Sequence, residues 1–129
     1  MSFISKLIVD GKEHVLLSCE YEFEQPLDPT GKPSGKPQGG QLSLVIEADG
    51  TSDLLHWMIH PTQLKDGSLM FYKRDAMARM KGIEFQGGIC CDYTEEYEAI
   101  DDTPLHIQLT IAVKTMQIDD VPYESNWAG

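Results

Sequence analysis

Residues 105–114 read Leu-His-Ile-Gln-Leu-Thr-Ile-Ala-Val-Lys and form the most regular alternation in the chain. Apolar side chains occupy every odd position from 105 to 113, and the even positions are polar or small. Because successive side chains of a strand point to opposite faces, this pattern predicts a strand with one buried face. Residues 41–48 repeat it, with the apolar residues at the even positions.

The same period of two continues toward the amino terminus. Residues 14–24 place acidic side chains at 20, 22 and 24, so we expect the odd positions to face the core: Val15, Leu17, Cys19, Tyr21 and Phe23. Asp10-Gly11 is a tight-turn signal. Residues 3–9 and 13–24 are therefore predicted to form a hairpin.

Further strands are predicted at 68–73, 82–86 and 89–97, with Gly87-Gly88 as a bulge or bend between the last two. Alternation places Cys91 in the core and Cys90 on the polar face. Ile118 and Val121 flank a turn, and Pro122 confines the last short strand to an edge of the sheet.

One segment, about 52–60, is predicted to be an α-helix. Thr51 or Ser52 can cap it, Leu54 with Met58 and Leu55 with Ile59 pair four apart on an apolar side, and Pro61 ends it. Trp57 is expected to cover the barrel as a structural anchor. Residues 75–80 could add one helical turn. Many short strands with one flanking helix predict a mainly β fold, a compact antiparallel β-barrel or sandwich, in a single domain over residues 1–129.

Composition limits the function classes. The 129 residues carry 10 basic and 21 acidic side chains, a net charge of −11, which disfavours nucleic acid or an anionic membrane as the main partner. No apolar run approaches the ~20 residues that span a bilayer, so we expect no membrane insertion. Three cysteines without a CxxC motif give no disulfide framework. The first six residues lack the layout of a signal peptide. We therefore expect synthesis in a cytoplasm and, if the protein is exported, a route that needs no cleaved signal peptide.

Residues 26–40 form a long loop rich in proline and glycine. A connection of this length in a small β domain is uncommon and is either functional or disordered. Two interpretations stay open: an irregular surface loop, or an extended arm that docks on another molecule.

Catalytic motifs find no support. The Gly31-to-Lys36 segment has the wrong spacing for a phosphate-binding loop. His56 and His60 have a metal-compatible spacing but no evident third ligand. No cysteine has a cationic sequence neighbour that would activate it. We expect no enzyme activity, no cofactor and no metal.

Charged residues are segregated along the chain. Five of the ten basic residues lie within 65–81, and six of the 21 acidic residues lie within 92–102. Such complementary segments suit a head-to-tail contact between copies, or they neutralise each other on neighbouring strands of one subunit. Strands 3–9 and 68–73 are apolar on both sides, which indicates a subunit contact or burial beneath the helix.

Several segments resemble a known family. They are 6–12 (KLIVDGK), 28–34 (DPTGKPS), 36–40 (KPQGG), 54–59 (LLHWMI), 71–77 (FYKRDAM), 91–93 (CDY) and 126–127 (NW). Taken in order over nearly the whole chain, they resemble the Hcp-like (TssD) tube proteins of type VI secretion systems, in the Bacteroidetes-type branch. Gly87-Gly88 and the doubled cysteine Cys90-Cys91 depart from that pattern.

The resemblance implies a structural tube subunit that forms stacked hexameric rings and is exported with spike and effectors inside a sheath. It carries over no catalytic residue. It implies that the long loop reaches a neighbouring subunit or ring. Together with the charge segments, this gives a candidate interface: Asp28, Thr30, Lys32, Pro33, Lys36, Lys73, Arg74, Arg79, Glu95 and Glu96. The alternative is a monomeric β-barrel that binds a small apolar ligand in its interior.

Overall fold

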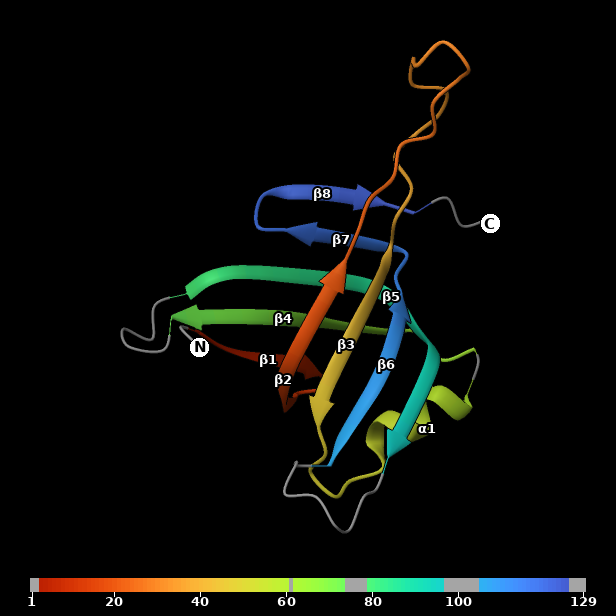
Figure 1. Cartoon of the computed structure of the whole chain (residues 1–129). Coiled ribbons are helices and arrows are strands. Elements are labelled where there is room, and N and C mark those ends of the chain that lie inside the picture. The colour runs from red at the N-terminus through yellow and green to blue at the C-terminus, as the bar shows by residue number, and fades with distance from the viewer. Residues whose placement is uncertain (1–2, 61, 74–78, 97–104, 126–129) are drawn as a thin grey trace.

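The computed structural model describes residues 3–60, 62–73, 79–96 and 105–125 (Figure 1). The elements in chain order are β1 Phe3–Val9, β2 Lys12–Tyr21, β3 Gln41–Glu47, α1 Asp53–Ile59, β4 Lys65–Lys73, β5 Arg79–Glu96, β6 His106–Ala112, β7 Thr115–Ile118 and β8 Val121–Glu124. Of the helical turn expected at 75–80, residues 75–78 lie outside the described residues, and the last two positions begin β5.

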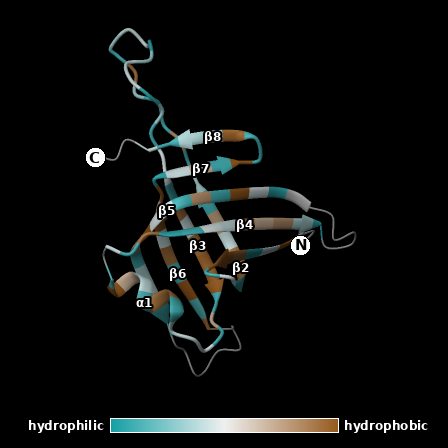
Figure 2. Cartoon of the chain, turned by 180° about the vertical axis from the view of Figure 1, so that it is seen from behind, coloured by the Kyte–Doolittle hydropathy of each residue, from teal (hydrophilic) through white to brown (hydrophobic). Residues whose placement is uncertain are grey.

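The strands form one antiparallel sheet that closes on itself. Its order is β4-β1-β2-β3-β6-β5-β7-β8, and β4 also pairs with β5, which closes a barrel of six strands. The β7–β8 hairpin extends the sheet beyond β5, and β8 is the edge that Pro122 predicted. Hydrophobic and hydrophilic residues alternate along β6 in Figure 2. The predicted mainly β barrel with one helix is confirmed.

Strand β5 bends at the predicted glycine pair. Its first half pairs with β4 and β7, and its second half pairs with β6. Gly87 has a φ of +65°, which side-chain-bearing residues rarely adopt. A Cβ atom on Gly88 would lie 2.9 Å from Cε1 of Phe85. The bend therefore needs both glycines, because one supplies the backbone angle and the other leaves room for Phe85.

Three positions of β2 and β5 that were expected in the core are exposed, because each of these two strands contains a β-bulge. In β2, Leu16 pairs with Ile46 and Ser18 with Val45, so Leu17 is an extra residue. Before the bulge the even positions face inward, and His14 and Leu16 are buried while Val15 is 51% exposed and Leu17 45% exposed. After it Cys19 and Tyr21 pack against the core, whereas Phe23, which was also expected in the core, lies beyond the end of β2 and is 39% exposed. An inserted residue reverses the alternation.

A second β-bulge, in β5, exchanges the faces that were expected for the two cysteine side chains. Cys90 pairs with Ile111 and Asp92 with Thr110, which leaves Cys91 as the extra residue of β5. Cys90 is 3% exposed and belongs to the core, whereas Cys91 is exposed. The placement expected from alternation is therefore wrong for both thiols, since the bulge inserts a residue between Cys90 and Asp92.

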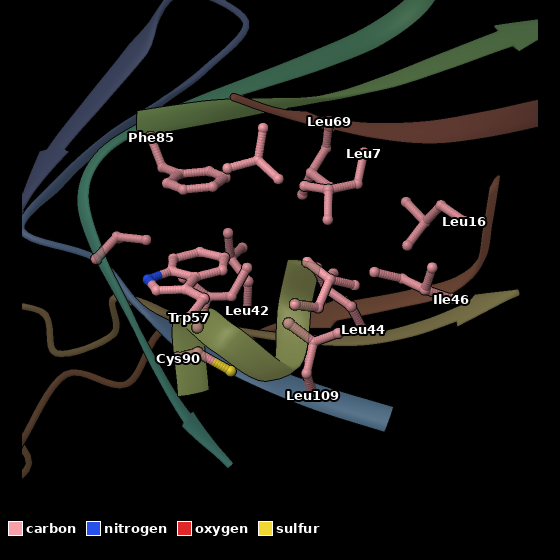
Figure 3. Packing of buried hydrophobic residues seen from close by; sticks show 14 of the residues in the cluster. Leu7, Leu16, Leu42, Leu44, Ile46, Trp57, Leu69, Phe85, Cys90 and Leu109 are labelled. Atoms are coloured by element: carbon pink, nitrogen blue, oxygen red, sulfur yellow. The ribbon is translucent and has the colours of Figure 1, made fainter. Parts of the chain in front are cut away.

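Helix α1 packs over the barrel through Trp57, which is 1% exposed and lies beside Leu42, Cys90 and Phe85 (Figure 3). Its indole N–H donates to the Gln63 carbonyl at 3.0 Å. Burial of Trp57 agrees with its expected role as an anchor.

Other features of the helix differ from expectation. Leu55 is 39% exposed and Ile59 65% exposed, so this pair lies outside the packed face. Ser52 is the N-cap residue but makes no side-chain cap bond. A helix of seven residues completes fewer than two turns. It therefore presents only a narrow face to the barrel, and Leu54 and Trp57 occupy it.

Candidate functional site: assembly surfaces of the barrel

Residues 22–40 leave the barrel between β2 and β3 and rise from its upper end in Figure 1. We call this segment the arm. Glu24 and Gln38 form a bridge, with the Glu24 N–H donating to the Gln38 carbonyl at 2.8 Å, and Leu27 bridges Pro33 nearer the tip. The Ser34 N–H also donates to the Pro26 carbonyl at 2.8 Å. The arm is therefore a hydrogen-bonded hairpin and not an irregular loop.

The tip of the arm is organised by Asp28. Its Oδ1 accepts hydrogen bonds from the Thr30 hydroxyl at 2.7 Å, the Thr30 N–H at 2.9 Å and the Lys32 N–H at 3.0 Å. The hydrogen bond from the Thr30 side chain is the largest of the causes that lower the pKa of Asp28 below its ordinary value. A carboxylate thus holds the turn that presents Lys32.

The base of the arm is fixed to the β7–β8 hairpin. The Tyr123 hydroxyl accepts the Gly39 N–H at 2.9 Å, and the rings of Phe23 and Tyr123 meet edge to face with centroids 4.9 Å apart. Gly40 has a φ of +90°, and a Cβ atom there would lie 2.2 Å from Oγ of Ser125. The sequence did not predict this role of Tyr123, because the local alternation of side chains gives no sign of a contact with Gly39, 84 residues away.

The interface residues expected on the arm are brought together at its outer part. Thr30, Lys32, Pro33 and Lys36 are exposed, and Asp28 is partly buried under its own turn. Lys32 and Lys36 form no ion pair with any residue in the described part of the chain. The arm therefore carries two uncompensated cations away from the barrel.

Among their described residues, the two charge segments are not brought together. Lys73 ends β4, Lys81 and Arg79 lie near the start of β5, and Glu95 and Glu96 end β5 beyond its bend. Arg74 lies outside the described residues. Lys73 and Lys81 form no ion pair with Glu95 or Glu96 where the structure describes the chain. Neutralisation within one subunit is thus not observed for these residues.

Lys65, which was expected to belong to the basic segment 65–81, lies apart from the other described basic residues of that segment. Its ammonium pairs with Asp10 in the β1–β2 turn, and its side chain is only 14% exposed. Lys65 therefore belongs to the lower end of the barrel and not to an exposed basic segment.

The outer face of β1 and β4 is partly apolar. Ile4 is 37% exposed, Ile8, Met70 and Tyr72 are half-buried, and Ile4 pairs across the strands with Tyr72. The Lys6 ammonium lies 5.4 Å from the centroid of the Tyr72 ring. The inner positions Leu7 and Leu69 are fully buried. The expectation of strands that are apolar on both sides agrees with this arrangement.

A cleft of about 640 Å³ lies beside α1, at the lower end of the molecule in Figure 1. The β1–β2 turn, α1 and the segment that follows it line this cleft. Lys12 pairs with Asp53 across it, and the ammonium of Lys65 lies 5.9 Å from the centroid of the Trp57 ring. The cleft thus combines an aromatic floor with paired charges.

His14 also lines the cleft and is 3% exposed. Its Nδ1 lies 3.5 Å from Oδ2 of Asp49, and its Nε2 is buried without a hydrogen-bond partner among the described residues. Sequence reasoning placed His14 with the outward polar positions, because the bulge at Leu17 was not foreseen. Leu16, an apolar residue in the same register, was the available signal.

The described residues contain no arrangement of side chains that would support a nucleophilic cysteine or a bound metal ion. Burial raises the pKa of the Cys19 and Cys90 thiols to about 11, so neither is a thiolate at neutral pH. His56 and His60 stack with centroids 6.3 Å apart, yet no three metal-ligating side chains gather where the chain is described. Within the same ranges, no helix is long and apolar enough to span a membrane.

The fold and these surfaces can be compared with known proteins. The family model TssD, hemolysin coregulated protein Hcp, matches residues 1–128. Hcp1 from Flavobacterium johnsoniae has a TM-score of 0.88 and 28% identity over 95% of this chain and 99% of that chain. No curated protein matches the chain.

Two more distant structures share the fold. Hcp1 from Salmonella typhimurium has a TM-score of 0.75 and 14% identity, over 92% of this chain and 86% of that chain. A sheath–tube complex of an extracellular contractile injection system, PVC, has a TM-score of 0.60 and 14% identity, over 91% and 87%. At such identities the likeness establishes the fold alone. The match of the family model over residues 1–128 establishes more, and this chain belongs to the hemolysin coregulated protein Hcp (TssD) family.

Proposed function

We propose that this chain is a structural tube subunit of a contractile, type VI secretion apparatus. Its 129 residues act as one domain, and copies join head to tail into closed hexameric rings that stack into a tube. The match of the Hcp (TssD) family model over residues 1–128 is the observation that carries this proposal. A 28% identical relative, Hcp1 from Flavobacterium johnsoniae, supports it.

Two features of the barrel suit such an assembly. The arm rises from one end of the barrel and α1 lies at the other (Figures 1 and 2), and a cleft lies beside α1, so the two ends are dissimilar. Lys73 and Lys81 remain without an intramolecular ion pair to Glu95 or Glu96 in the described ranges. A contact between unlike patches is heterologous, and such contacts close into rings when the rotation between copies allows it.

In this proposal the chain is made in the bacterial cytoplasm and leaves with the spike and its effectors when the sheath contracts. Export of the assembled tube by its own apparatus needs no cleaved signal peptide. The protein acts by assembly and not by catalysis, which agrees with the raised pKa values of its buried thiols.

The alternative, a monomeric barrel that binds a small apolar ligand, is less well supported. The barrel interior is filled by buried side chains, including Leu7, Leu42, Leu44, Trp57 and Phe85 (Figure 3). A ligand-binding barrel needs an interior cavity of a few hundred Å³ for its ligand.

Size-exclusion chromatography with light scattering separates the two functions. We expect a mass several times 14.5 kDa that corresponds to a closed ring, and ring-shaped particles by negative-stain electron microscopy. A monodisperse monomer at high protein concentration and low salt would contradict the proposal.

A further inference from the structure

Strand β8 ends the sheet and leaves one of its edges open. It pairs with β7 along its whole length, from Val121 opposite Ile118 to Glu124 opposite Thr115, and no other strand of the described ranges pairs with it. In both views β8 lies on the outer side of β7, away from the barrel (Figures 1 and 2). An open edge exposes backbone N–H and C=O groups that can pair with a second chain.

The register of the hairpin decides which backbone groups of β8 face outward. A two-residue turn joins the strands, so Ile118 and Val121 form a pair whose N–H and C=O groups bond each other. The pairs alternate along an antiparallel ladder, so Tyr123 also bonds to β7, whereas the backbone groups of Pro122 and Glu124 point away from it. Proline has no N–H. Glu124 is therefore the only residue of β8 that offers an outward N–H donor.

Apart from this proline, the edge has the properties of a strand that associates. Val121 is 60% exposed, and Ile118 and Tyr123 are half-buried. A groove of about 470 Å³ beside it is lined by residues of β5, β7 and β8. Proline is depleted in strands, yet here it removes no hydrogen bond from the hairpin, because its nitrogen faces outward. The missing donor therefore affects only a chain that approaches the edge.

The charges around β8 act in the same direction. Asp119 and Asp120 form the turn, Glu124 lines the groove, and all three are exposed. Residues 119–125 contain no lysine or arginine. Two copies that met edge to edge here would bring like charges close to one another, which destabilises a pair of strands. The hairpin thus carries two of the devices by which proteins protect edge strands, a proline and a set of like charges.

We propose that Pro122 is a specificity-determining residue of assembly, which denies the edge of β8 to a second copy of this chain; this rests on the proposed tube function. If two β8 strands paired antiparallel with their Tyr123 residues opposite each other, each copy could donate hydrogen bonds from residues 122 and 124. Pro122 removes one of these two donors from each copy. Such a contact is isologous, so it would join whole rings or tubes side by side instead of adding a copy to a ring.

Restoring the donor tests this role. Threonine carries an N–H and is favoured in strands, so Pro122→Thr should keep the rings and the melting temperature of the parent. We expect light scattering to give a weight-average mass at least about twofold above that of the parent, increasing with protein concentration, because each pairing event joins two assemblies. Gln117→Thr is the matched control. It places the same side chain opposite Pro122 on β7, where the backbone groups point toward β5, and should keep the parental mass.

A second substitution separates the backbone donor from the side chain. Pro122→Thr combined with Glu124→Pro moves the proline to the other outward position, so the edge again has one donor. This double variant should return to the parental mass, although it has also lost a carboxylate. Hydrogen exchange locates the contact. At concentrations where rings persist, the peptide that covers residues 115–125 should exchange more slowly at high than at low concentration in Pro122→Thr, and equally at both in Gln117→Thr.

The outcomes separate the two proposals. A larger mass with slower exchange in Pro122→Thr, reversed in the double variant, supports the role of Pro122. Three results would overturn this role and leave the tube function intact: a parental mass of Pro122→Thr, a mass that stays raised in the double variant, or a lower melting temperature without slower exchange. A parent protein without rings would overturn the tube function, and the mass of Pro122→Thr relative to that parent would still decide the role of the edge.

Discussion

Trp57 joins the only helix of the described chain to the barrel. It is 1% exposed, and its indole N–H is satisfied by the Gln63 carbonyl. We expect Trp57→Ala to lower the free energy of unfolding by about 3–5 kcal/mol, a large part of the roughly 5–15 kcal/mol that stabilises a domain. Chemical denaturation followed by circular dichroism measures this loss, and ring yield should fall with it. His56→Ala, on the exposed side of the same helix, is the control and should change stability by less than about 0.5 kcal/mol. Equal losses from both variants would contradict the anchor role. A second residue-scale prediction concerns Asp28, whose pKa is lowered from 3.8, first of all by the hydrogen bond from the Thr30 side chain. Because the folded pKa lies below the unfolded one, the stabilisation of the tip is complete above the unfolded value and is lost as pH falls through the folded value. We expect the NMR titration of the Asp28 carboxyl carbon to have its midpoint below 3.8, with the Thr30 and Lys32 amide shifts following the same curve. Amide shifts that stay constant through that midpoint would show that the carboxylate does not organise the tip.

At the scale of elements, we expect the arm to be needed for stacking of the rings and not for folding of the barrel. Replacing residues 26–36 by an Asn-Gly turn would keep the Glu24–Gln38 bridge and the contact of Gly39 with Tyr123. Because loop length changes stability by only about 0.6 kcal/mol per doubling, the melting temperature of the barrel should change little. We expect electron microscopy of the shortened chain to show rings that fail to stack. Tubes of parental length from the shortened chain would show that the arm is not needed for assembly. The elements also show what the sequence could predict. Alternation located β3 and β6 and their inward side chains, because both strands pair without interruption. It misplaced Val15, Leu17, Cys90 and Cys91, because each bulge inserts one residue and leaves no mark in the hydrophobic pattern. The same error hid the burial of His14. Two further features depend on long-range contacts that no local sequence pattern predicts: the pairing of β4 with β5, which closes the barrel, and the contact of the arm with Tyr123.

At the scale of the whole molecule, the separation of charge gives assembly a direction. Lys81 and Glu96 are exposed, lie in different halves of the bent strand β5 and form no ion pair with each other. If neighbouring copies pair them, Lys81→Glu should place two carboxylates in contact at every junction of a ring, and Glu96→Lys should place two cations there. An exposed pair contributes only about 0.2–1 kcal/mol, but the effect repeats at every junction. Each single variant should therefore need a higher protein concentration to form rings, as light scattering would measure. The double variant exchanges the two signs and should regain the parental behaviour, although each chain then carries two substitutions. Raising the salt concentration should reduce the difference among all four proteins, because the Debye length falls to about 8 Å at physiological ionic strength. Lys114→Glu, an exposed charge reversal of the same size, should form rings as the parent does. If the double variant assembles no better than the single ones, these two residues do not face each other across the junction, and the charge segments act only on solubility.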